Sequence, residues 1–421
     1  MGQYRDLIIS RCGISSKSVK MIICVLSVVT FLQCTGIDKN ADRGLIVIDV
    51  TKDYPTKVLY LQDIAKVEYI PLGTNDNTLM RTTIARFHLS DDYIVTTNPL
   101  SNQGDFFVFD GKGKSKFSFN HRGQGPGEYN RIGSFAFDEK AKEVFIFDRY
   151  SSSNKIIVYA EDGTFKRILS NLPELQSIEI YNYDDEALLV YDESGIFGSG
   201  ILEQNEYSNK PYLFVSKADG SVIETLNTHL PERLSNAAVW KAQSDGQEMI
   251  HSVGVPITNN RSFGKDFIIA DWSSDTIYKL TPQRELQPMI VRIPSMKDTN
   301  PRILLSNFLV TDKFILLGVY EMNYETLKNG GNVEARQLMY DFKTGEINKY
   351  RFVNRDITTS TSVRIWEATT PGNTGVSMYD ASFLLNLDEK GELTGDLKEL
   401  VKSLDEDDNP VLVKIKFFEA P

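Results

Sequence analysis

The stretch that decides the fold is His121-Arg122-Gly123-Gln124-Gly125-Pro126-Gly127-Glu128-Tyr129. Three glycines and a proline alternate with polar residues, so neither a regular helix nor a strand can run through it. Strand-like sequences lie on both sides, at residues 117–119 and 133–137. A glycine-rich loop beside a basic residue can also cradle phosphate, but that site needs a helix directly after the loop. Because a strand pattern follows, the stretch predicts a tight connector between two similar sheets.

The sequence around this connector repeats along the chain. Each copy contains an apolar strand, a polar loop, a second apolar strand, a turn with glycine and a third strand. The turns contain Gly113, Gly163, Gly220 and Gly345, and a degraded copy lies at Thr281-Pro282-Gln283-Arg284. Their spacing of roughly 50 to 63 residues is typical of the four-stranded blades of a β-propeller with variable loops.

Both ends of the chain contain further strand-like sequences. Residues 45–50 and 67–72 precede the first copy, and residues 363–366, 382–387 and 411–417 follow the last one. Residues 394–404 place Leu397, Leu400, Val401 and Leu404 on one helical face. A propeller closes by completing one blade from both termini, which removes its open edges. We therefore expect an all-β, six-bladed β-propeller of four-stranded antiparallel blades with one short C-terminal helix; seven blades is the alternative.

The N-terminus carries a targeting signal. Lys17 and Lys20 precede an apolar run over residues 21–33, which has the length of a signal-peptide core and is short for a membrane span. Cys34 follows directly, as at the lipidation site of a bacterial lipoprotein; a plain secretory signal or a short anchor is the alternative. The expected organisation is a targeting segment over 1–34, a flexible tether over 35–44 and one propeller domain over 45–421.

Composition restricts the partners of the domain. The net charge of −11 argues against a nucleic-acid partner, since phosphate binding needs a basic surface. All three cysteines (Cys12, Cys24 and Cys34) lie in the targeting segment. Disulfides and cysteine-based metal sites are therefore not expected in the mature domain.

Several motifs together resemble a known family. They are Leu61–Ile64, Val67–Leu72, the connector Gly123–Tyr129 and Asp408–Val413. With the repeated Phe-x-Phe-Asp and Glu-Asp-Gly elements, they look like NHL-type repeats and resemble the six-bladed β-propeller lipoproteins of Gram-negative bacteria, whose function is largely unassigned. The resemblance implies a propeller anchored to the cell envelope, at the outer membrane, through a lipid on Cys34. It implies no catalytic residues.

Propeller geometry predicts where a ligand site lies. Loops between second and third strands share one face with the connectors between blades, and ligand sites concentrate in loops on a rigid scaffold. The candidate ligand-binding residues on this connector face are His121, Arg122, Asp148, Arg149, Tyr150, Asp271 and Trp272. The expected structural residues of the connector are Gly123, Gly125, Pro126, Gly127, Glu128 and Tyr129. The alternative for Asp148 and Asp271 is capping of a loop, and for Trp272 core packing. The insertions at about 193–211 and 318–335 belong to the same face.

Catalysis has weaker support in the sequence. His88, His121, His229 and His251 are far apart, without the spacing of a metal motif, and no serine-hydrolase elbow is present. No metal or cofactor is predicted. The favoured function is a binding or scaffolding module for a glycan, peptide or protein partner. The alternative is a propeller lyase or hydrolase with a metal or carboxylate site in the central channel.

Overall fold

The computed structural model describes residues 44–419 apart from 81–85, 99–103, 150–154, 176, 194–205, 208, 229, 231–232, 235–236, 245–246, 255–259, 330, 360, 366–367 and 370–371. Only the backbone is described for the strands within 237–254 and for residues 368–369. The predicted targeting segment with Cys34, most of the tether and Tyr150 therefore lie outside the described residues.

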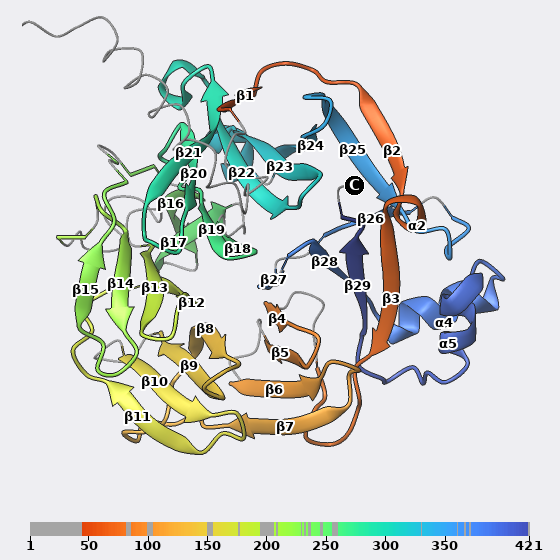
Figure 1. Ribbon diagram of the computed structural model, residues 1–421, viewed down its shortest axis with the longest axis horizontal. Coiled ribbons are helices and arrows are strands. Elements are labelled where there is room, and N and C mark those ends of the chain that lie inside the picture. Colours follow the sequence, from red (N-terminus) through yellow and green to blue (C-terminus); the bar gives the residue numbers. More distant parts are fainter. Residues whose placement is uncertain are drawn as a thin grey trace, which may run out of the picture. The chain divides into compact units, whose positions relative to one another are not determined.

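The part of the chain from Val47 onward forms six antiparallel sheets arranged in a ring, which confirms the predicted six-bladed β-propeller (Figure 1). Each of the first three blades is a four-stranded meander whose first strand lies nearest the centre. Blade 1 contains β4 (Phe87–Leu89), β5 (Tyr93–Thr97), β6 (Asp105–Asp110) and β7 (Ser115–Asn120). Blade 2 contains β8 (Ile132–Asp138), β9 (Glu143–Asp148), β10 (Lys155–Ala160) and β11 (Phe165–Leu169). Blade 3 contains β12 (Ile178–Asn182), β13 (Ala187–Asp192), β14 (Tyr212–Ser216) and β15 (Val222–Thr225).

Blades 4 and 5 repeat the meander, and the strands of blade 5 are the longer ones, with seven to nine residues each. Blade 4 contains β18 (Arg261–Phe263), β19 (Asp266–Ile269), β20 (Thr276–Leu280) and β21 (Leu286–Ile293). Blade 5 contains β22 (Arg302–Val310), β23 (Phe314–Met322), β24 (Glu334–Asp341) and β25 (Ile347–Val353). A hairpin of β16 (Ala237–Ser244) and β17 (Gln247–Gly254) precedes blade 4. The dipeptide Asp245-Gly246 between its strands is a strong hairpin signal that the repeat pattern had obscured.

The ring closes through strands from both ends of the chain, as predicted. In blade 6, β29 (Val411–Phe417) lies between β28 (Thr374–Tyr379) and the N-terminal strand β3 (Ala65–Pro71). The register between β29 and β3 runs without interruption from Val411↔Pro71 to Phe417↔Ala65. The first two strands pair with blades 4 and 5, which the sequence had not indicated. β1 (Ile46–Asp49) extends blade 4 beyond β21, and β2 (Thr56–Tyr60) pairs in parallel with β25 at the edge of blade 5.

Two short strands add to the blades, and β27 (Ala368–Thr369) lies near the centre of the ring (Figure 1). β26 (Ser362–Val363) pairs with β25, and β27 pairs in parallel with β4 of blade 1. The main apolar clusters fill the spaces between neighbouring blades. One joins blades 1 and 2 through Phe106, Phe135 and Tyr159, and another joins blades 2 and 3 through Phe145 and Val190. Burial between blades therefore holds the ring together.

The predicted glycine turns lie between the third and fourth strands of four blades. Gly113, Gly163, Gly220 and Gly345 have φ values of 84°, 86°, 88° and 70°. In the degraded copy of blade 4, Arg284 occupies the equivalent position with φ 64°. Its guanidinium lies 4.3 Å from the ring centre of Phe214 and pairs with Asp184. These contacts compensate for a backbone conformation that a non-glycine residue seldom adopts.

Four short α-helices and one 3-10 turn, η2 (Met296–Asp298), accompany the sheets in the described chain. The α-helices are α2 (Leu61–Ile64), α3 (Tyr324–Lys328), α4 (Ala381–Glu389) and α5 (Gly395–Val401). Helix α5 confirms the expected C-terminal helix, but the prediction of a strand over 382–387 was wrong because this segment belongs to α4. Its apolar residues Ala381, Leu384 and Leu387 repeat every three positions and pack into one cluster with Leu397 and Val401 of α5.

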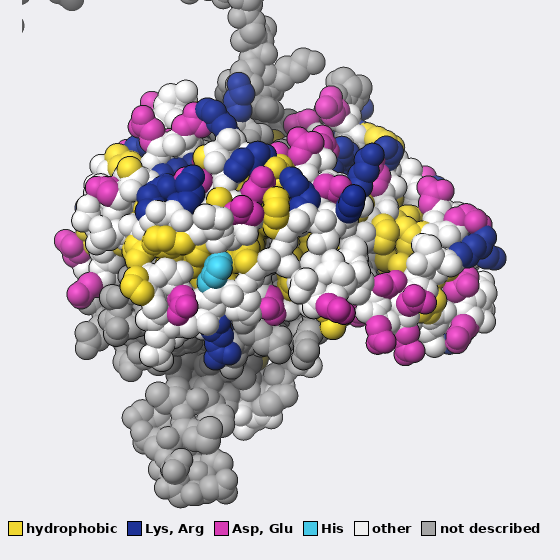
Figure 2. Space-filling view, turned by 90° about the horizontal axis from the view of Figure 1, so that it is seen from below, with side chains coloured by type: hydrophobic (Ala, Val, Ile, Leu, Met, Phe, Trp, Pro, Cys, Tyr) yellow, Lys and Arg dark blue, Asp and Glu magenta, His cyan; other side chains and the backbone are white. Residues whose placement is uncertain are grey.

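The two helices form a lobe at the edge of the ring (Figure 1). Its acidic side chains include Asp388, Glu389, Glu392, Asp396 and Glu399. On the face drawn in Figure 2, carboxylates gather at this edge, whereas charges of both signs mix over the blades. No helix in the described chain is long and apolar enough to cross a membrane.

Candidate functional site

The innermost strands of blades 1 to 3 bring polar side chains together at the connector face. Arg86 directly precedes β4, Ser134 lies on β8 and Glu179 lies on β12. Ser177 precedes β12, and Glu193 follows β13 on the same side. We call Arg86, Ser134, Ser177, Glu179 and Glu193 the axial cluster.

Arg86, Ser134 and Glu179 form the centre of the axial cluster. The Arg86 guanidinium pairs with the Glu179 carboxylate, and Arg86 Nη1 donates a hydrogen bond of 2.8 Å to Ser134 Oγ. Ser134 Oγ in turn donates to Glu179 Oε2 over 3.2 Å and accepts from the backbone N–H of Ile180 over 3.0 Å. Ser134 and Glu179 are buried. Three blades thus contribute to one network of charge-assisted hydrogen bonds.

Glu193 adds a second carboxyl group. Ser177 Oγ donates to Glu193 Oε2 over 2.9 Å, and the backbone N–H of Glu193 donates to Ser177 O over 2.9 Å. Burial raises the pKa of Glu193 well above its ordinary value, and the negative charge of Glu179 raises it further. The Ser177 hydrogen bond and the positive charges of Arg149 and Arg86 oppose this shift. A carboxyl group held neutral in this way can donate a hydrogen bond at neutral pH.

Among the predicted site residues, Arg149 acts on this cluster, because its positive charge opposes the rise in the pKa of Glu193. A β-bulge between Ile132 and Ser134 leaves Gly133 against Arg149, and a Cβ at Gly133 would lie 2.8 Å from Arg149 Cβ. The glycine therefore allows Arg149 to approach the innermost strand of its blade.

Asp148, next to Arg149, holds the connector. It is buried, and its Oδ1 accepts hydrogen bonds from the backbone N–H groups of Asn130, over 2.8 Å, and Arg131, over 3.2 Å. These are the contacts of a loop cap. Asp148 therefore caps the connector, and the adjacent Arg149 supplies a positive charge near the axial cluster.

Asp271 belongs to a buried network between blades 3 and 4. Its Oδ2 accepts a hydrogen bond of 2.7 Å from Tyr191 Oη and lies 3.4 Å from Arg233 Nη2, while its Oδ1 accepts from Ser273 N over 2.7 Å. Trp272 is 2% exposed and packs in the apolar core, with its ring centre 6.3 Å from that of Tyr320. These contacts stabilise the fold, and a direct part in ligand binding stays a prediction for both residues.

His121 and Arg122 lie between blades 1 and 2. The His121 ring stacks on Tyr159 with centroids 5.1 Å apart, and its Nε2 lies 2.8 Å from Gly163 O. Arg122 is exposed and forms a backbone bridge with Tyr129. The His121 ring also stacks on Phe119 of blade 1, and Arg122 N donates to Asn120 Oδ1 over 3.0 Å, so these contacts are made with the connector and its two blades.

The connector itself is fixed by its own polar groups and by blade 2. Glu128 Oε2 accepts from Gly125 N over 2.8 Å, and Tyr129 Oη donates to Gly104 O over 2.6 Å. Tyr159 Oη of blade 2 donates to Gly127 O over 2.6 Å. Tyr129 is fully buried. The loop that decides the fold therefore connects two blades and also holds them together.

The sequence did not single out Arg86, Ser134, Ser177, Glu179 or Glu193. Only Glu193 had a signal in the sequence. It follows Asp192, the last residue of β13, just as Arg149 follows Asp148, the last residue of β9. The other residues lie in or beside innermost strands, where a polar side chain cannot be distinguished from an ordinary strand position. Within the described residues, no group of three or more His, Cys, Asp or Glu side chains could hold a metal ion.

Comparison with known proteins supports the fold. A family described as Domain of unknown function (DUF4934) matches residues 45–416, and no curated protein matches the chain. A crystal structure of a Bacteroides fragilis protein described as exported is 17% identical with a TM-score of 0.59, over 89% of this chain and 100% of that one. At this identity the likeness shows the fold alone.

Two more distant structures have lower scores. A DUF4221 member from Bacteroides vulgatus is 10% identical with a TM-score of 0.43, over 85% of this chain and 98% of that one. Virginiamycin B lyase from Staphylococcus aureus is 12% identical with a TM-score of 0.38, over 83% of this chain and 100% of that one. Similarity at this level carries no functional argument.

Proposed function

The chain belongs to the DUF4934 family, and we propose that this member is an exported binding module for a glycan, peptide or protein ligand. The ligand binds on the connector face, at the axial cluster. The observation that carries the proposal is the meeting of Arg86, Ser134 and Glu179 from three separate blades, with Glu193 beside them.

The chemistry of the cluster supports binding. Burying charged and hydroxyl groups costs free energy unless hydrogen bonds replace their water. The propeller could fill the same positions with apolar side chains, as it does in the layers between blades. A cluster containing ionised groups, hydroxyls and a carboxyl of raised pKa can recognise sugar hydroxyls or the polar groups of a peptide. Arg149 would supply a further positive charge.

Export and anchoring form a second part of the proposal. A signal peptide ending before Cys34 would direct the chain to the cell envelope, where a lipid on Cys34 would hold it at the outer membrane. The exported description of the Bacteroides fragilis relative is consistent with this location. Mass spectrometry of the mature N-terminus tests the proposal: a lipid-modified Cys34 supports it, whereas an unmodified Cys34 or a retained leader refutes the anchor.

Glycan and peptide arrays test the binding function. Wild-type protein should retain a small set of ligands, and Glu193→Gln and Arg149→Gln variants should change that set. Glu389→Gln, which alters an exposed carboxylate on helix α4, serves as the matched control and should leave it unchanged. All variants should first be shown to unfold at the wild-type temperature. Identical binding by wild type, Glu193→Gln and Arg149→Gln would place the site elsewhere.

Acid–base catalysis is a second candidate function, favoured by the two carboxyl groups of the cluster. Glu193 has a raised pKa beside Glu179, and the separation of two pKa values is how an enzyme assigns an acid and a base. The test is mass-spectrometric detection of products after incubation with each array ligand. Turnover by wild-type but not by Glu193→Gln supports a lyase or hydrolase, whereas binding without turnover supports the module. Metal analysis of the purified chain tests a metal-dependent reaction independently.

A further inference from the structure

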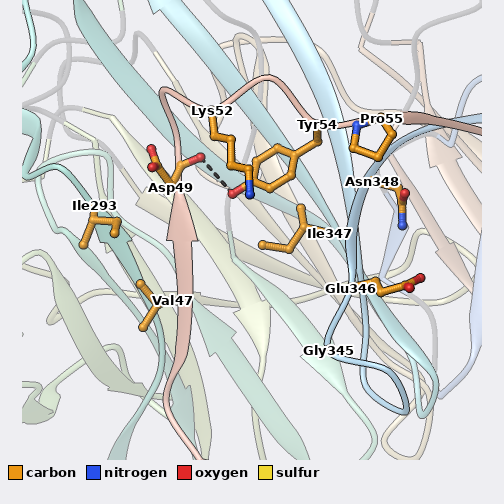
Figure 3. A pocket seen from close by; sticks show the side chains of 10 residues that line it. All are labelled: Val47, Asp49, Lys52, Tyr54, Pro55, Ile293, Gly345, Glu346, Ile347 and Asn348. Carbon is orange, nitrogen blue, oxygen red and sulfur yellow. Dashed lines mark hydrogen bonds between the residues drawn. The ribbon is translucent and has the colours of Figure 1, made fainter.

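A groove runs along the outer rim of the ring, away from the axial cluster. It lies between β1, the outermost strand of blade 4, and the start of β25, in the outer part of blade 5 (Figure 3). Its volume is about 510 Å³. Val47 from β1, Ile293 from the end of β21 and Ile347 from β25 direct their side chains into the same space. We call this cavity the rim groove.

The walls of the rim groove are fixed by hydrogen bonds. The chain crosses from β1 to β2 over residues 50–55, and Arg336 holds this crossing by donating to Val50 O over 2.6 Å and to Lys52 O over 3.2 Å. Tyr54 Oη donates to Asp49 O over 3.1 Å, the bond drawn in Figure 3. A groove with walls held in place loses less entropy when a ligand binds.

Open strand edges border the groove. β1 is the last strand of its sheet, and in the described part of the chain no strand pairs with its outer edge. On the opposite side, β2 begins to pair with β25 only at Thr56↔Lys349. Among the described strands, Ile347 and Asn348 of β25 are therefore paired with β24 alone, through Tyr340 and Met339. An extended peptide can add to such an edge through its own backbone.

The side chains of the groove define the peptide that fits. Val47 is 49% exposed and Ile293 is 46% exposed, so both can offer aliphatic surface to a ligand. Lys52 extends into the groove with its Nζ 5.3 Å from the ring centre of Tyr54. Asp49 Oδ1 accepts from Thr51 N and Oγ1, and the Glu346 carboxylate points away from the cavity. The ammonium group of Lys52 is thus the charged group directed into the groove, while Asp49 remains an ionised carboxylate in its lining, because the hydrogen bond from Thr51 lowers the pKa of Asp49.

We propose that the rim groove binds an extended segment of a partner protein. The segment pairs with the outer edge of β1, packs apolar side chains against Val47 and Ile293, and directs an acidic side chain to Lys52. Apolar and acidic residues alternate with solvent-facing ones, because successive side chains of a strand point to opposite sides. This surface is separate from the axial site and does not depend on the function proposed there.

Fluorescence anisotropy with two labelled hexapeptides tests the inference. Val-Thr-Glu-Thr-Val-Thr places two valines and a glutamate on one side, and Val-Thr-Lys-Thr-Val-Thr replaces the acid with a base. The purified mature chain should bind the glutamate peptide about tenfold more tightly, a difference of the size expected for one favourable charge contact. Lys52→Glu should reverse the preference. Lys57→Glu is the matched control, since Lys57 is an exposed lysine on the adjacent β2, and it should keep the wild-type preference.

A second pair of variants tests the apolar contact. Val47→Thr should weaken both peptides, whereas Val58→Thr, at a residue that is 43% exposed on β2, should leave binding unchanged. The inference is overturned if neither peptide binds saturably, or if Lys52→Glu and Lys57→Glu behave alike. It is also overturned if sedimentation shows a dimer that Val47→Thr dissociates, because a second copy would then occupy the groove.

Discussion

At the scale of single residues, the molecule uses buried charge to join its blades. Lys217 of blade 3 pairs with Asp138 of blade 2 over 2.6 Å, and Arg233 pairs with Asp271. Removing one partner of a buried pair leaves an uncompensated charge, which costs more than the pair contributes. These residues are therefore sensitive sites whatever ligand the protein binds.

Asp271→Asn should lower the free energy of unfolding by about 3–5 kcal/mol, the cost of breaking a buried pair. Asp341→Asn is the matched control. Asp341 caps the turn of blade 5 through the N–H groups of Lys343 and Thr344 and should cost less than about 1 kcal/mol, because asparagine still accepts these bonds. Urea unfolding of both variants measures the difference. Equal losses in the two variants would show that the ion pair with Arg233 adds nothing to the free energy of unfolding.

The Glu143 carboxylate makes stability depend on pH. It accepts two hydrogen bonds of 2.8 Å from Arg167, and these bonds, together with Lys166 and against the effect of burial, lower its pKa from 4.5 to about 2. Because its pKa is lower in the folded state, Glu143 stabilises the protein above its unfolded pKa. This contribution, about 2–3 kcal/mol, is lost as pH falls from roughly 4.5 towards 2. Unfolding free energy measured across this range should fall less steeply in Glu143→Gln, and parallel curves would contradict the assignment.

At the scale of elements, the turns between third and fourth strands set the repeat. A side chain at Gly163 would lie 2.7 Å from Phe119 Cγ, whereas one at Gly345 would meet nothing closer than Tyr340 Oη at 3.9 Å. Both glycines have positive φ, so alanine is strained at either position. Only at Gly163 does packing against the previous blade add to that strain.

Gly345→Ala should therefore cost about 1–2 kcal/mol and Gly163→Ala about 2–4 kcal/mol, since overpacking adds to the backbone term. Thermal unfolding of the two variants, compared with wild type, gives the difference directly. A Gly345→Ala variant as unstable as Gly163→Ala would show that the contact with Phe119 is relieved without cost.

The elements also show what could be read from sequence. The glycine turns and alternating apolar strands predicted the blades because both patterns are local. The segment over 382–387 was misassigned because a short apolar run fits a strand or a helix equally well until its packing partner is known. The addition of β1 and β2 to blades 4 and 5 had no local signal, since their partners lie more than 200 residues away.

At the scale of the whole molecule, closure decides whether the ring is stable. β3 covers the edge of β29, and Lys414 and Lys416 each lie 2.8 Å from Asp91 of blade 1. Deleting residues 1–44 should leave the unfolding temperature within about 2 °C of wild type, whereas deleting residues 1–72 should abolish a cooperative transition. Calorimetry distinguishes these outcomes. A cooperative transition without β3 would show that the ring holds without closure.

The whole molecule also explains why the axial cluster was not predicted. Arg86, Ser134 and Glu179 lie on three blades, and only the ring brings them together. Arg149 was predicted because it follows a strand end in sequence. The position of the connector face could therefore be predicted from the sequence. The side chains that meet there could not, because they depend on the arrangement of the blades around the axis.

The most direct test of the axial site is the affinity of the best array ligand measured by calorimetry from about pH 5 to pH 9, a range that includes the raised pKa of Glu193. If the neutral Glu193 carboxyl donates a hydrogen bond to the ligand, wild-type affinity should fall as pH rises and the group ionises. Glu193→Gln, which keeps a donor at every pH, should bind with little dependence on pH. The same pH profile in both proteins would contradict a ligand site at the axial cluster.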